Sequence, residues 1–68
     1  MQFTITFHPS GHKQPGVGNT LEEALNFAKH EAKTVRAGTV RFEIESNDGM
    51  VRKAWAWDHS EWTEVPNA

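Results

Sequence analysis

The sequence predicts an α+β fold in which a single antiparallel sheet of four to five strands carries one helix packed on one face. Three observations predict it: apolar and polar residues alternate in both the first and the second half of the chain, one stretch between them has helical spacing, and an Asp-Gly turn separates two alternating segments. With 68 residues, the chain is expected to form one domain spanning residues 1–68.

The first expected strand lies near the amino terminus, where Phe3, Ile5 and Phe7 alternate with polar residues. This is the period of a strand with one buried and one solvated face. Residues 8–19 are rich in glycine and proline and are expected to form a loop, with room for a brief edge strand near Val17.

A helix is expected to begin after Thr20, because Thr20 and Glu23 have the spacing of a capping box. Gly38 suits the position just beyond its end, where a left-handed backbone favours glycine. An apolar stripe at helical spacing should face the sheet; its members are Leu21, Ala24, Leu25, Ala28 and Ala32, with Phe27 on its flank and Val35 as an extension.

A hairpin is expected in the second half of the chain, because Asn47-Asp48-Gly49 is typical of a tight turn between strands. The preferred register pairs Phe42 with Trp55 and Val40 with Trp57, which brings apolar side chains together on one face. A second turn at residues 58–61 and a last short strand at 62–65 complete the order β, helix, β, β, β.

Composition excludes several classes of protein. The chain has no cysteine, which removes disulfide frameworks, zinc ribbons and thiol nucleophiles and weakly favours a cytoplasmic location. The alternating amino terminus is unlike a signal peptide or a membrane span. A formal net charge of −2 has the wrong sign for a dedicated nucleic-acid binder, so any such role would depend on local patches.

The residues indicate no enzyme, no cofactor and no metal site. Asp58-His59-Ser60 contains the residue types of a hydrolytic triad, but three consecutive residues in a turn cannot face one another as nucleophile, base and orienting group. His8 and His12 are four apart in a loop interrupted by proline and glycine, so solvated histidines are favoured over metal ligands. The loop glycines are not followed by the lysine of a phosphate-binding loop.

Basic residues follow one side of the expected helix end, at Lys29, Lys33 and Arg36, and continue at Arg41. Such a ridge could grip a phosphate backbone or an acidic protein groove. The alternative is that these cations complement the helix dipole and solvate an exposed face, which is the more frequent reason for basic residues near a helix end.

Three tryptophans, Trp55, Trp57 and Trp62, fall within eight residues. Trp55 and Trp57 share one face of a strand and are expected to be buried under the helix. Trp62 lies on a terminal strand and is expected to be partly exposed, where a partner could dock.

Taken together, Gly38-Thr39-Val40, the alternating residues 42–45, the turn at 47–49, the aromatic strand and a tryptophan after a short polar turn resemble a known family. Residues 20–65 are similar to small phage anti-CRISPR proteins directed against type I systems, in particular inhibitors of type I-F surveillance complexes. The resemblance implies a non-enzymatic protein without a cofactor. Such a protein binds the crRNA-guided complex in the host cytoplasm and blocks hybridisation of target DNA to that complex. The resemblance also implies that Lys29, Lys33, Arg36 and Arg41 are candidates for the contacting ridge. From its position at the sheet edge, we expect Trp62 to lie beside the binding surface. The alternative is a small module that binds nucleic acid or another protein.

Overall fold

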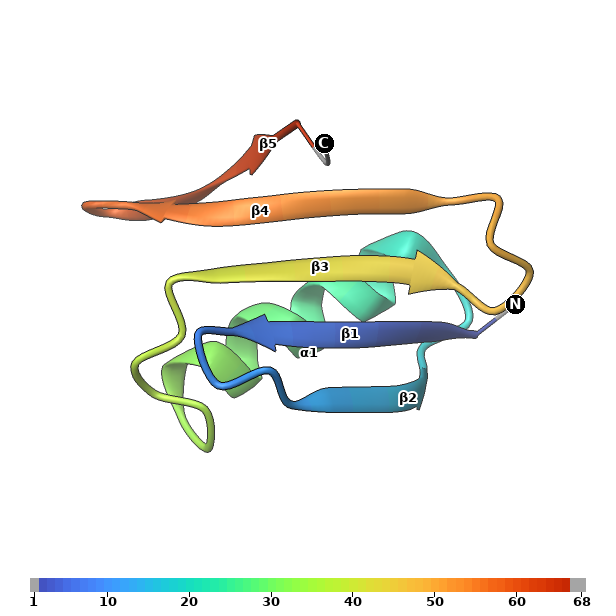
Figure 1. Ribbon diagram of the computed structural model, residues 1–68, viewed down its shortest axis with the longest axis horizontal. Helices are drawn as coiled ribbons and strands as arrows, with labels where there is room; N and C mark the ends of the chain where they lie inside the picture. Colours follow the sequence, from blue (N-terminus) through green and yellow to red (C-terminus); the bar gives the residue numbers. More distant parts are fainter. Residues whose placement is uncertain (1, 67–68) are drawn as a thin grey trace.

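The computed structural model describes residues 2–66 and contains one sheet and one helix (Figure 1). The sheet has five strands in the order β2-β1-β3-β4-β5, and each neighbouring pair is antiparallel. The predicted α+β class is therefore confirmed, with the brief edge strand near Val17 as the fifth strand. In chain order the elements are β1 (Phe3–His8), β2 (Lys13–Val17), α1 (Leu21–Lys33), β3 (Arg41–Ser46), β4 (Arg52–Asp58) and β5 (Glu61–Val65).

The core lies between α1 and the three strands β2, β1 and β3. Ile5 pairs with Ile44 and Phe7 with Phe42, so the alternation in β1 and β3 places all four side chains on the face toward the helix, where they are fully buried. The small side chains of α1, Ala24 and Ala28 among them, let the helix approach this face closely. The stripe expected from the sequence thus packs as predicted over the first three turns.

The amino-terminal end of α1 carries a cap at Thr20, whose Oγ1 accepts a hydrogen bond from the backbone N–H of Glu23 at 3.2 Å. The Glu23 carboxylate accepts in return from the N–H of Asn19, at 2.8 Å, rather than from that of Thr20. The hydrogen bond to the Thr20 side chain is therefore as predicted, whereas the bond to the Glu23 side chain comes from the residue before the one predicted.

The helix ends at Lys33, earlier than the sequence indicated, and residues 34–38 form turns. The hydroxyl of Thr34 donates to the carbonyl of His30 at 2.8 Å, and the N–H of Arg36 donates to the carbonyl of Glu31 at 2.7 Å, a pattern that closes helix ends. Val35 consequently leaves the apolar stripe and is 70% exposed. The prediction that Val35 extends the buried stripe is wrong.

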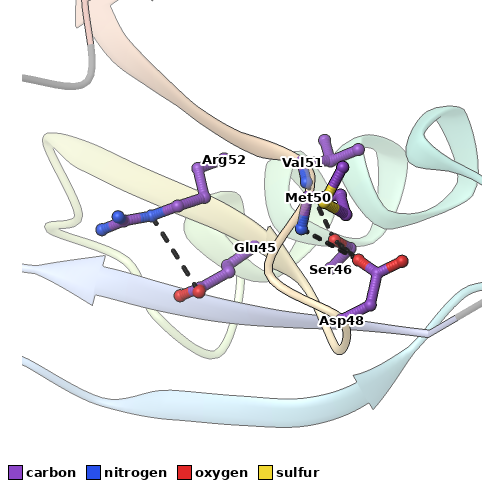
Figure 2. A network of polar contacts seen from close by, with 6 residues as sticks. All are labelled: Glu45, Ser46, Asp48, Met50, Val51 and Arg52. Carbon is purple, nitrogen blue, oxygen red and sulfur yellow. Dashed lines mark hydrogen bonds and ion pairs between the residues drawn. The ribbon is translucent and has the colours of Figure 1, made fainter.

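The hairpin between β3 and β4 has the predicted register, with Phe42 opposite Trp55. Its turn is held by hydrogen bonds of Ser46, a buried polar residue (Figure 2). The Ser46 hydroxyl donates to Asp48 Oδ1 at 2.6 Å and accepts from the N–H of Val51 at 2.9 Å. The hydrogen bond from Ser46, and then that from the N–H of Met50, lower the pKa of Asp48.

The helix crosses the sheet diagonally, so that its carboxyl end lies toward β1 and β2 and away from β4 and β5 (Figure 1). Trp55 is 7% exposed, as predicted, but Trp57 is 47% exposed and Val40 is 57% exposed. The predictions that Trp57 and Val40 belong to the core are wrong, because the helix stops and diverges before it can cover them.

α1 has 13 residues, and no helix within residues 2–66 is long and apolar enough to cross a bilayer.

Candidate binding groove

An open groove of about 680 Å³ separates the carboxyl half of α1 from the β4–β5 hairpin. The segment before β3 closes it at one side. Among the described residues, its lining carries two cations and no acidic side chain. The lining residues are Lys29, Ala32, Lys33, Gly38, Thr39, Val40, Trp57 and Trp62.

The apolar floor of the groove consists of Val40 and two tryptophans, Trp57 and Trp62. Trp57 and Trp62 are opposite each other in the β4–β5 register, and their rings meet edge to face with centroids 5.3 Å apart and planes at 62°. Trp62 also packs on the buried Phe42, with ring centroids 4.7 Å apart. Trp62 is therefore half-buried and held by the core, as expected for a partly exposed residue, while Trp57 presents nearly half of its surface to solvent.

Two lysines flank the floor from the helix. Lys29 and Lys33 are four residues apart, which places them one turn apart on the same side of α1. Within residues 2–66 neither takes part in an ion pair, whereas Lys53 is paired with Glu64 at 3.3 Å. The groove therefore combines apolar surface with uncompensated positive charge.

The other two cations of the predicted ridge lie elsewhere. Arg36 turns toward the loop between β1 and β2, where its Nη2 is 2.7 Å from Nε2 of His12. Arg41 alternates with the buried Phe42 and so lies on the sheet face opposite the helix, with its Nη2 3.7 Å from the Glu43 carboxylate. The structure thus brings Lys29, Lys33 and Trp62 together and separates Arg36 and Arg41 from them.

The histidines that resembled parts of catalytic or metal-binding motifs lie in a turn or contact a neighbouring aromatic or acidic side chain. His59 is the first of two residues connecting β4 to β5 and has a positive φ of 61°. His12 stacks on Phe7, with ring centroids 6.2 Å apart, and His8 lies 3.6 Å from the Glu43 carboxylate. In the part of the chain that the structure describes, no group of three or more histidine or acidic side chains is placed to hold a metal ion.

Sequence reasoning missed the two exposed large apolar members of the groove, Val40 and Trp57. Their alternation with polar residues is that of core positions, so periodicity alone assigns them to the buried face. The number of elements could have indicated that these residues are exposed, because one narrow, alanine-rich helix cannot cover a sheet of five strands.

Comparison with protein-family models, with curated proteins and with solved structures found no match to this chain.

Proposed function

We propose that this protein is a non-enzymatic binding module that docks a protein partner on the groove between α1 and the β4–β5 hairpin. The observation that carries the proposal is the exposed indole of Trp57, fixed on an apolar floor beside two unpaired lysines. Tryptophan is enriched at the centres of protein interfaces, where a surrounding rim excludes water. The two lysines complement an acidic partner.

The partner we propose is a type I crRNA-guided surveillance complex, whose binding of target DNA the protein would block. Support for this partner comes from the resemblance of residues 20–65 to small phage inhibitors of such complexes. Lys29, Lys33 and Trp62, three of the residues that the resemblance or the edge position singled out, share the groove. Because the surveillance complex acts in the bacterial cytoplasm, we place the protein there.

A second candidate function is binding of single-stranded nucleic acid. A base could stack on the exposed face of Trp57 while Lys29 and Lys33 contact phosphates, which is how sequence-tolerant single-strand binders work. The net charge of −2 and the separation of Arg36 and Arg41 from the groove favour the protein partner instead.

The two functions are separated by one set of binding experiments. The proposed inhibitor co-elutes with a purified type I surveillance complex on a sizing column without DNA, and it lowers the complex's affinity for labelled target duplex. A single-strand binder shifts a labelled oligonucleotide by itself, with strong salt dependence. Absence of co-elution with type I complexes of several subtypes would refute the proposed partner.

A matched pair of charge reversals tests the location. Lys33→Glu should weaken binding to the complex because it places an acid in the groove. Lys13→Glu makes the same charge change on the edge strand β2, away from the groove, and should leave binding unchanged. Equal effects of the two variants would show that net charge, not the groove, governs binding.

A further inference from the structure

We infer that the groove receives an amphipathic helix of the partner, whose apolar side rests on the two tryptophans and whose flank presents acidic residues one turn apart. The inference rests on the proposed function, since it specifies the element of the protein partner that docks. It commits to a helix rather than a strand, a loop or a second copy of this chain.

The space beside α1 has the dimensions of one helix. Five strands at about 4.8 Å spacing make a sheet roughly 19 Å wide, whereas one helix with its side chains is about 10 Å across. α1 packs against β1, β2 and β3 and diverges from β4 and β5 (Figure 1). The uncovered width in the helix layer is therefore about that of a second helix.

The surfaces of the groove suit close packing of a helix. Ala32 lines the wall on α1, and its small side chain permits an interaxial distance at the lower end of the usual 8–10 Å. Val40, Trp57 and Trp62 supply the apolar floor, on the same face of the sheet that α1 covers elsewhere. A partner helix would complete this layer, with its apolar stripe directed at the floor.

The charges specify the flank of the partner helix. Lys29 and Lys33 project from successive turns of α1, so their side chains are spaced like residues four apart on any helix. Two acidic residues at positions i and i+4 of a helix lying alongside α1 would meet both lysines. An incoming helix with lysines at those positions would be repelled.

The described strands and helix argue against the other occupants. A strand added at the free edge of β5 would meet Glu61, Glu64 and Pro66, features that discourage edge pairing. The opposite edge strand, β2, contains Pro15. A second copy could offer only α1 within residues 2–66, and the apolar stripe of α1 is buried against its own sheet.

The test uses three synthetic 18-residue peptides without tryptophan, titrated into the full-length protein and followed by its tryptophan emission. The first is an amphipathic helix with a leucine stripe flanked by glutamates at i and i+4. The second replaces these glutamates by lysines, and the third has the composition of the first with apolar and polar residues alternating. We expect saturable one-to-one binding of the first peptide, at least tenfold tighter than that of the other two, with gain of helical circular dichroism.

The double variant Lys29→Glu/Lys33→Glu should invert the preference between the acidic and the basic helix, whereas Lys13→Glu should not. Equal affinities for the three peptides, or binding of none of them, would overturn the inference. A double variant that still co-elutes normally with the surveillance complex would overturn the groove as its docking site while the proposed partner stands. Charge-dependent binding of the acidic helix by a protein that fails to bind any surveillance complex supports the helix groove and refutes the proposed partner.

Discussion

Truncation of Trp57 to alanine should weaken partner binding strongly while leaving the fold intact. The side chain is 47% exposed, and a tryptophan can bury up to about 250 Å², so roughly 120 Å² of Trp57 is available to a partner. At about 25 cal/mol per Å² this corresponds to about 3 kcal/mol, or on the order of a hundredfold in affinity. The costs of ordering side chains and desolvating polar groups reduce this contribution to the binding free energy, so we expect Trp57→Ala to lower the affinity by between about 30-fold and 100-fold.

The same change should cost the fold much less than the loss of a core tryptophan. Trp55 is only 7% exposed, and truncation of a buried tryptophan typically costs about 3–5 kcal/mol. For Trp57, half of whose surface is already in water, we expect about 1–2 kcal/mol, because the edge contact with Trp62 and part of the apolar burial are lost.

The assay measures affinity for the proposed partner, a type I surveillance complex, and for the acidic helical peptide, alongside denaturant unfolding of each variant. Met50→Ala is the matched control, because Met50 is 82% exposed but lies in the turn between β3 and β4, outside the groove. The reasoning is refuted if Trp57→Ala binds like the wild type, or if Met50→Ala weakens binding as much.

Three further predictions concern the fold. Gly18→Ala should lower the free energy of unfolding by about 3 kcal/mol, because φ is +68° and the new Cβ would lie 2.9 Å from the backbone nitrogen of Ala24; Gly38→Ala, with positive φ but open space, should cost only about 1–2 kcal/mol in the same denaturant titration. His59→Gly should raise the free energy of unfolding by about 0.5 kcal/mol, and with it the melting temperature, because His59 is the first residue of a two-residue hairpin turn and has a φ of 61°, which glycine adopts without strain. A lower melting temperature would contradict this. Asp48 has a lowered pKa in the folded state, so its stabilising effect is present above its unfolded pKa and is lost as pH falls through the folded pKa; unfolding measured across the acid range should show less of this pH dependence in Asp48→Asn, and an unchanged profile would refute it.

Local patterns predicted most of the fold because they reflect local physics. Alternation at Phe3, Ile5 and Phe7 identified β1, and the Asp-Gly turn determined the pairing of Phe42 with Trp55. The length of the helix was predicted less well, because hydrogen bonds that Thr34 and Arg36 donate to carbonyls of the last helical turn closed it before Gly38. Helix propensity and apolar spacing do not reveal where such bonds form.

The candidate site was predictable only in part, because it depends on how far one element covers another. Lys29, Lys33 and Trp62 were identified from the sequence and lie together in the groove. Arg41 continues the same run of basic residues in the sequence, but its side chain lies on the sheet face opposite the helix. Successive residues of a strand point to opposite faces, and the neighbouring Phe42 points to the helix. Trp57 was assigned to the core because periodicity gives the face of a residue and not the extent of the layer above it.

The rigidity of the groove floor bears on how strongly a small protein of this kind can bind. Trp62 is fixed by its contact with the buried Phe42, and Trp57 is fixed by its strand and by the ring of Trp62. A side chain that is already ordered loses little conformational entropy when a partner covers it. Because the floor belongs to the same aromatic cluster that closes the core, the residues that stabilise β4 and β5 also preorganise the groove. A partner that binds the folded protein raises its melting temperature by an amount that grows with the logarithm of the ratio of partner concentration to Kd. If the partner occupies the groove, Trp57→Ala should reduce that rise at equal partner concentration, and an unchanged rise would place the binding surface outside the groove.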